Sequence, residues 1–210
     1  MLSIPGRDGE IIAQDTRFSN LQITYQVFLR AKNASDLSSK MRDIKNWLYQ
    51  DLNRYNRLED YYNPRFYRKA VINNKLNIDD IRNKLGTFTV SFSALPFQYS
   101  IGGDQEILLQ SGAAITNPYH FVAKPYLKVY GTGGGSFTIA SESETKTWHV
   151  MNINQFMEID SELMLCYKGS VSQNLNFIGD GFPLLHAGKS RITFDGGITS
   201  ISIIPRWCSL

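Results

Sequence analysis

The segment Leu85–Ser100 constrains the fold of this 210-residue chain more than any other. Apolar residues from Phe88 to Phe92 alternate with threonine and serine, which is the pattern of a strand with one buried and one solvated face. Such an apolar face predicts a packed partner sheet. Pro96 then removes a backbone donor and Gly102-Gly103 follows, so we expect sheet pairing to stop or reach an edge at Pro96. A completed core strand followed by proline and glycine predicts that a domain ends here.

We therefore predict a first domain over residues 1–100 and a second over residues 101–210. In the first, Leu21–Arg30 alternates as a strand that should pair near Phe88–Phe92. Phe66–Ile72 is predicted as a further strand. Between them we expect the one α-helix, capped by Ser35 and ending within Asn53–Arg57. Its apolar stripe, which should lie across the sheet, is formed by Leu37, Met41, Ile44, Leu48 and Leu52.

The sequence pattern of the second half indicates short strands separated by turns, and this pattern predicts a β-sandwich. The fold class expected for the whole chain is thus mainly β. The predicted strands are Glu106–Gln110, Tyr126–Tyr130, Ser136–Ala140, Thr147–Met151, Phe156–Ile159, Leu163–Tyr167, Arg191–Phe194 and Ile198–Ile204. The predicted turns are Asn117-Pro118, Gly133–Gly135, Asp160-Ser161, Gly179–Gly181 and Asp195–Gly197.

Composition excludes several classes of function. The net charge of +3 is too small and too scattered to predict a nucleic-acid or membrane surface. No apolar run approaches the roughly 20 residues of a membrane span, and no basic segment followed by an apolar one opens the chain, so we expect no membrane partner and no exported protein. Cys166 and Cys208 lack a second Cys or His at metal spacing and are predicted to be free thiols of a reducing cytosol.

No constellation of catalytic residues is evident. Gly131–Gly135 lacks the Lys-Ser/Thr of a phosphate loop and is predicted to form a hairpin tip. His120, His149 and His186 lie far apart without ligand spacing. Asp160 has an ordinary turn role rather than a place in an acid–base pair. We therefore predict no enzyme, no catalytic residue, no metal site and no cofactor.

Two segments are candidates for a subunit interface. In the N-terminal arm, Arg7, Asp8 and Gly9 precede Ile11 and Ile12, and Ile11–Ala13 would be free to pair with a neighbour's sheet edge. Such head-to-tail contacts close into rings. The second candidate is formed by Tyr61, Tyr62 and Arg65, because tyrosine and arginine are enriched at interface hot spots. Stacking on single-stranded nucleic acid is the alternative for the second segment, and it stays open.

Several local patterns follow one another in the order found in one family. They are Ile4–Ile11, Ile44–Leu48 with its I-x-x-W-L pattern, Tyr61–Pro64, Gly86–Phe92 followed by Pro96-Phe97, Pro125–Gly131, Ile159-Asp160, Phe182–Gly188 and Ile198–Arg206. In these residues the chain resembles the distal tail (Dit) proteins, the baseplate hub components of long-tailed phages that infect Gram-positive bacteria.

The resemblance implies an N-terminal sandwich-like ring domain with one α-helix and a C-terminal galectin-like β-sandwich. It further implies a homohexameric ring in the virion tail, assembled in the host cytoplasm. Its partners would be the tail-tube protein, the tail-associated hub protein and receptor-binding proteins or their adaptors, with DNA passing through the lumen without specific binding. A carbohydrate-binding module for host adhesion is the alternative, and a wall hydrolase is a third hypothesis.

Overall fold

The computed structural model describes residues 18–76, 80–82 and 85–210. In these residues the chain is mainly β with one α-helix and two antiparallel sheets, as the sequence predicts. It divides into two compact units. The first is formed by Met1–Arg57 and Lys69–Pro96, and the second by Leu58–Arg68 and Phe97–Leu210. The division falls within a strand, between Pro96 and Phe97, and residues 58–68 group with the second unit.

The first sheet has the strand order β1-β5-β3-β2, and β4 and β14 also pair with β5. Its elements are β1 (Leu21–Arg30), α1 (Ala34–Tyr49), β2 (Asn56–Leu58), β3 (Phe66–Ile72), β4 (Asp80–Arg82), β5 (Leu85–Ser100) and β14 (Cys208–Ser209). The predicted pairing is confirmed, since Ile23 lies opposite Phe92 and Val27 opposite Phe88.

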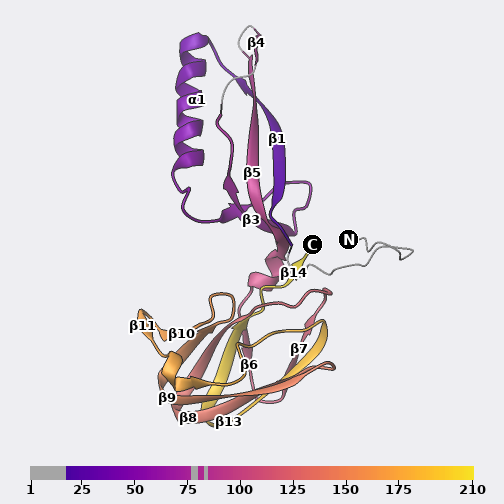
Figure 1. The fold of residues 1–210 in the computed structure, drawn as a ribbon, viewed down its shortest axis with the longest axis vertical. Coiled ribbons are helices and arrows are strands. Elements are labelled where there is room, and N and C mark those ends of the chain that lie inside the picture. The colour runs from indigo at the N-terminus through magenta and orange to yellow at the C-terminus, as the bar shows by residue number, and fades with distance from the viewer. Residues whose placement is uncertain (1–17, 77–79, 83–84) are drawn as a thin grey trace, which may run out of the picture. The chain divides into compact units, whose positions relative to one another are not determined.

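The apolar face of this sheet packs against α1, so the expectation of a partner sheet over this face is wrong, while the predicted position of the helix is confirmed (Figure 1). A helix with an apolar stripe buries such a face as well as a second sheet does. Met41, Phe88 and Val90 form the centre of this core. The observed cap is Asn33, two residues before the predicted Ser35, and its side chain accepts a hydrogen bond from Asp36 N. The helix ends at Tyr49, earlier than predicted, and leaves Leu52 half exposed.

Strand β5 continues through Pro96 to Ser100, against expectation. Pairing with β1 nevertheless ends at Ala94, two residues before the proline. After Pro96, Gln98 and Tyr99 pair with β14 near the C-terminus. Pro96 therefore separates two successive partners of one strand, and the missing backbone donor ends one pairing without ending the strand.

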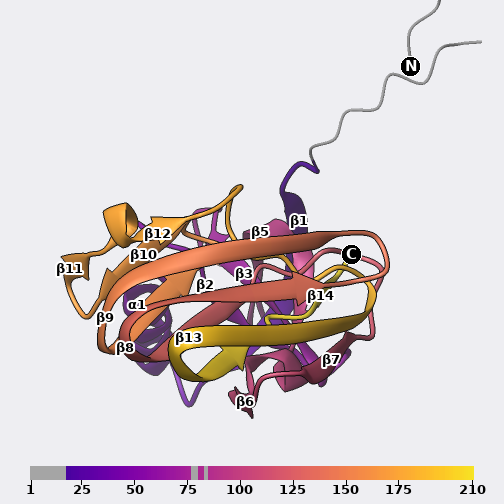
Figure 2. The same cartoon turned by 90° about the horizontal axis from the view of Figure 1, so that it is seen from below.

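The second sheet has the strand order β11-β10-β9-β8-β13-β6, with β12 paired to β9 and β7 to β13. Its elements are η1 (Ile101–Asp104), β6 (Ile107–Leu109), β7 (Ala113–Asn117), β8 (Tyr126–Ala140), β9 (Thr145–Asp160), β10 (Leu165–Lys168), β11 (Val171–Ser172), η2 (Asn174–Asn176), β12 (Phe177–Ile178) and β13 (Gly188–Ile204). Figure 2 shows β8, β9 and β13 side by side as long curved strands. The core that they enclose includes Trp148, Phe137 and Ile201.

The strands β8, β9 and β13 each span two of the short strands predicted from the sequence. Gly133–Gly135 and Asp195–Gly197 lie inside β8 and β13, so the predicted turns there, and the hairpin tip at Gly131–Gly135, are wrong. The glycines are needed because the two backbones approach closely: a Cβ on Gly197 would lie 1.9 Å from Thr132 O. Register shifts between β8 and β13 mark the same place, as expected for bulges that bend long strands.

In the described residues, no helix combines the length and the apolar character that a membrane span requires.

Candidate functional site

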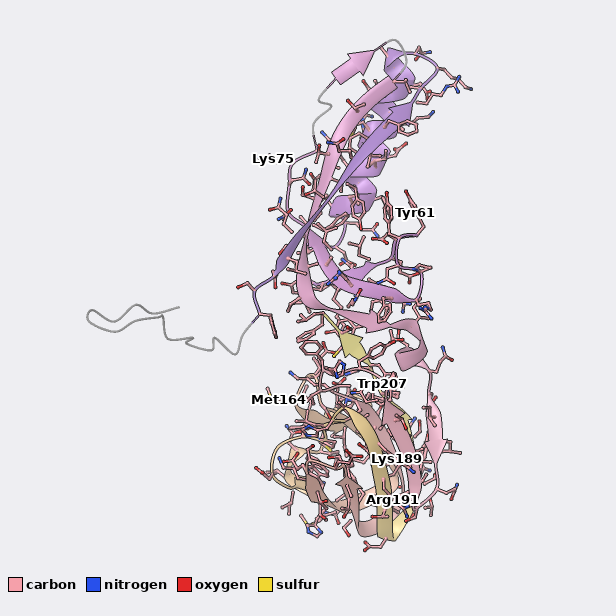
Figure 3. The ribbon with its side chains drawn as sticks, turned by 90° about the vertical axis from the view of Figure 1, so that its right-hand side faces the viewer. Tyr61, Lys75, Met164, Lys189, Arg191 and Trp207 are labelled. Carbon is pink, nitrogen blue, oxygen red and sulfur yellow. The ribbon has the colours of Figure 1, made fainter. Side chains whose placement is uncertain are left out.

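The Tyr61–Tyr62 pair is an exposed aromatic surface in the second unit. The two side chains are 80% and 74% exposed, and their rings stack with centroids 4.3 Å apart. Tyr61 is labelled in Figure 3. Their hydroxyl oxygens lie 3.0 Å apart, and this hydrogen bond raises the pKa of Tyr61. Asp60 Oδ1 accepts hydrogen bonds from Tyr62 N and Asn63 N, an Asx turn that holds the pair in place.

The residues that follow the pair in sequence contact the rest of the second unit. Tyr67 is 9% exposed, stacks on Tyr99 at 5.5 Å and donates its hydroxyl to Asp104. The carbonyl of Arg65 accepts a hydrogen bond from Ile101 N, while the residue itself is exposed. Tyr61, Tyr62 and Arg65 are thus brought together on one segment, which the sequence had assigned to the first domain. The other candidate residues, Arg7, Asp8, Gly9, Ile11 and Ile12, lie outside the described residues.

Strand β1 forms an edge of the first sheet. Within the described ranges it pairs with β5 alone, over all ten of its residues. Among the described residues, the backbone N–H and C=O groups on its outer side therefore have no strand partner, and such groups can pair with another strand.

From Gln22 to Phe28, one face of the β1–β5 ladder carries uncharged side chains, most of them hydroxyls and amides, and the exposed Arg30 lies on the same face at the end of β1. Opposite pairs on this face are Gln22 with Ser93, Thr24 with Ser91, Gln26 with Thr89 and Phe28 with Thr87. The side chains on β1 are exposed, and Thr24 Oγ1 lies 3.1 Å from Ser91 Oγ. The alternation of Leu85–Ser100 predicted this solvated face, and the alternation of Leu21–Arg30 predicted its counterpart on β1. The register adds which residues lie opposite each other.

Sequence reasoning missed the partner of Asp160. Asp160 Oδ1 accepts hydrogen bonds from Glu162 N and Leu163 N, which is the expected turn role. Arg206 in addition binds both of its carboxylate oxygens, at 2.8 and 2.9 Å. No local signal links two residues 46 positions apart. In the part of the chain that the structure describes, no group of three or more His, Cys, Asp or Glu side chains is placed to hold a metal ion.

Residues 1–94 match the family model of the phage tail protein RIFT-related domain. No curated protein sequence matches the chain. Among solved structures, the chain is similar to the Dit protein of phage SPP1, described as a paradigm of the hub adsorption apparatus in phages that infect Gram-positive bacteria. The identity is 13%, the TM-score is 0.75, and the match covers 100% of this chain and 86% of that one.

The baseplate of phage P2, in its activated conformation with calcium, matches at a TM-score of 0.48 and 6% identity, over 87% of this chain and 78% of that one. A TM-score at this level does not establish a common fold. The family model thus matches residues 1–94, and the fold of the whole chain is similar to that of the SPP1 Dit protein.

Proposed function

We propose that the chain is a structural protein of the virion tail that forms a hexameric ring at the tail's distal end. As a baseplate hub assembled in the host cytoplasm, the ring links the tail-tube protein to the tail-associated hub protein and to receptor-binding proteins or their adaptors. Residues 1–100 build the ring, and residues 101–210 form a galectin-like sandwich outside it. The role is non-enzymatic, in keeping with the phage tail and baseplate proteins that the chain resembles.

The observation that carries the proposal is the open edge of β1. A ten-residue strand with one partner among the described residues is a template for a second chain. A neighbour's segment Ile11–Ala13 supplies apolar residues for such pairing, and a head-to-tail contact repeated around an axis closes a ring. Tyr61, Tyr62 and Arg65 add an exposed aromatic surface of the kind enriched at protein interfaces.

The uncharged part of the β1–β5 face, which runs from Gln22 to Phe28 and stops short of Arg30, is suited to line a channel for DNA. A lysine or arginine on such a wall would bind phosphate and retard the passage of DNA, whereas hydroxyl and amide groups let it slide. From Gln22 to Phe28, the side chains of β1 on this face carry no charge, and neither do their partners on β5.

Light scattering on a sizing column tests the ring. The full chain should elute as a hexamer, and deletion of Met1–Glu10 should weaken assembly more than removal of residues 101–210. Replacing both Tyr61 and Tyr62 with alanine should also weaken it, whereas Leu175→Ala, at an exposed residue away from the proposed interface, should not. A monomer at every concentration, or the reverse order of the two deletions, would refute the proposed ring domain.

The carbohydrate-binding alternative gains no support from tryptophan. Trp148 and Trp207, the tryptophans of the second unit, are 1% and 8% exposed, so neither offers its ring face to a sugar. We therefore keep the tail hub as the proposed function.

A further inference from the structure

The loop that joins β12 to β13 contains an aspartate between two glycines, Gly179-Asp180-Gly181. The Asp180 side chain is 90% exposed. Its carboxylate lies 3.4 Å from Lys146 Nζ, which is closer to Glu144, at 2.9 Å. The three loop residues lie outside the strands, so no ladder restrains rotation of their backbone. The carboxyl of Asp180 is therefore accessible and can turn toward its own backbone.

The backbone nitrogen that follows this carboxyl is accessible as well. Gly181 has a φ of 72°, and a Cβ built on it would meet no atom within 4 Å, so the space around it is open. In the described part of the chain, Gly181 N donates no hydrogen bond. Because glycine has no side chain, nothing on the residue itself blocks the approach of the carboxyl carbon to this nitrogen. The two atoms can meet in a five-membered ring.

A second Asp-Gly step, Asp195-Gly196, is held inside β13. Asp195 Oδ1 accepts hydrogen bonds from Ser136 N at 3.2 Å and from Ser136 Oγ at 2.6 Å. Gly196 is paired with Gly135 of β8. This ladder has to open before the carboxyl of Asp195 can reach the nitrogen that follows it. The same dipeptide is thus accessible in one place and protected in the other. A third Asp-Gly step, Asp8-Gly9, lies outside the described residues.

We propose that Asp180 is a site of spontaneous backbone isomerisation, at which aspartate converts to isoaspartate. Gly181 N attacks Cγ of Asp180: the N–Cγ bond forms, a C–O bond of the carboxyl breaks, and this oxygen leaves as water with the carboxyl and amide protons. Water then adds to the carbonyl carbon of Asp180 in the resulting succinimide and breaks its bond to Gly181 N. The chain now continues through Cβ and Cγ. The reaction needs no reagent besides water, and it does not depend on the proposed tail function.

Isomerisation at Asp180 changes how the loop packs on Trp148. Gly181 O accepts a hydrogen bond from Trp148 Nε1 at 2.8 Å, and a Cβ on Gly179 would lie 2.2 Å from Trp148 Cδ1. Trp148 is 1% exposed and stacks on Phe137 with ring centroids 5.4 Å apart. Isoaspartate places one more carbon atom in the backbone between the two contacts, so at least one of them has to move. We therefore expect the isomer to loosen the loop from the core of the second sheet.

Peptide mapping of the folded full chain after long storage at neutral pH tests the site. Trypsin separates the two steps into residues 169–189 and residues 192–206, each with a single aspartate. An isoaspartyl peptide keeps the parent mass but elutes separately, and electron-transfer fragmentation identifies it. Isoaspartate should form about tenfold faster or more at Asp180 than at Asp195, because opening a paired core strand costs more free energy than moving a loop. In urea the two rates should become similar. No isoaspartate at Asp180, or equal rates in the folded chain, would refute the site.

The variant Asp180→Glu is the matched control, because it keeps the carboxylate but cannot close the five-membered ring. Fresh wild type and fresh variant should melt alike, which verifies that the variant folds. After storage, the isoaspartyl wild type should melt about 3 °C lower, as for the loss of a buried hydrogen bond, while the variant keeps its melting temperature. Equal losses in both chains would show that other damage is responsible. Isoaspartate at Asp180 without any change in melting temperature would refute its effect on Trp148.

Discussion

Asp160 is 4% exposed and nevertheless charged, because Arg206 reaches it with two hydrogen bonds. Burial alone would raise the pKa of this carboxyl, but Arg206 and the backbone N–H groups of Leu163 and Glu162 outweigh it and hold the pKa below its ordinary value. Arg206 itself has a φ of 55° and donates its backbone N–H to Gly103. The ion pair therefore fixes the C-terminal segment onto the end of β9.

Replacing Asp160 with asparagine should lower the free energy of unfolding by about 3 kcal/mol, since the largely buried Arg206 guanidinium then keeps only the longer contact with Glu162, at 3.5 Å. Urea unfolding at neutral pH measures the loss. Asp51→Asn, which breaks an exposed ion pair with Arg54, is the matched control and should cost less than about 1 kcal/mol. Similar losses in both variants would contradict the special role of the buried pair.

The same variant has a defined pH dependence. Because the folded-state pKa of Asp160 is lowered, its contribution to stability is present above the unfolded-state pKa of about 4 and is lost as pH falls through the folded-state value. The stability difference between the wild type and Asp160→Asn should therefore shrink on acidification. A difference that stays constant from neutral to acidic pH would show that packing, not charge, is responsible.

At the scale of elements, the three long strands of the second unit depend on glycines where β8 and β13 meet. Gly197→Ala should cost about 3 kcal/mol, as for overpacking at a site that cannot relax, because its Cβ would lie 1.9 Å from a backbone oxygen. Gly134→Ala is the control: its Cβ would meet no atom closer than 3.6 Å, so it should be nearly neutral. Chemical denaturation measures the free energy of unfolding of both variants. Equal losses of stability would show that the close approach of the two backbones is not the cause.

These glycines also explain what sequence patterns could and could not predict. The strand Leu21–Arg30 and its pairing followed from alternation, because one apolar face requires a matching neighbour. The glycine runs at Gly133–Gly135 and Asp195–Gly197 indicated turns, since a local signal does not distinguish a turn from two backbones in contact. The uncharged face and the Asp160–Arg206 pair depend on residues far apart in sequence, so only the fold brings them together.

At the scale of the whole molecule, the end of β5 belongs to the second unit. A fragment of residues 97–210 should melt cooperatively with β-rich circular dichroism. A fragment of residues 101–210 should fold less stably, because it lacks Gln98 and Tyr99, the partners of β14, and the hydrogen bond from Ser100 N to Trp207 O. Thermal melts of the two fragments test this, and an unfolded longer fragment or identical melting temperatures would contradict it.

The proposed channel predicts negligible binding of double-stranded DNA at about 150 mM salt, where screening leaves only dense cationic clusters effective. The net charge of +3 and the uncharged side chains of β1 from Gln22 to Phe28 on the β1–β5 face give the physical reason. A gel-shift assay at this salt concentration measures the binding of double-stranded DNA. A tight complex would instead revive the nucleic-acid interpretation of the segment Tyr55–Arg68, whose tyrosines and arginines could stack on bases.

The Tyr61–Tyr62 pair finally gives the protein a built-in chemical reporter. Tetranitromethane nitrates accessible phenol rings, and in the isolated chain both of these rings are open to solvent while Tyr67, six residues on, is 9% exposed. In a ring that covers the pair, nitration at Tyr61 and Tyr62 should fall toward the level of Tyr67. Peptide mass spectrometry would then follow assembly by the reactivity of three tyrosines in one short peptide, without any measurement of particle size.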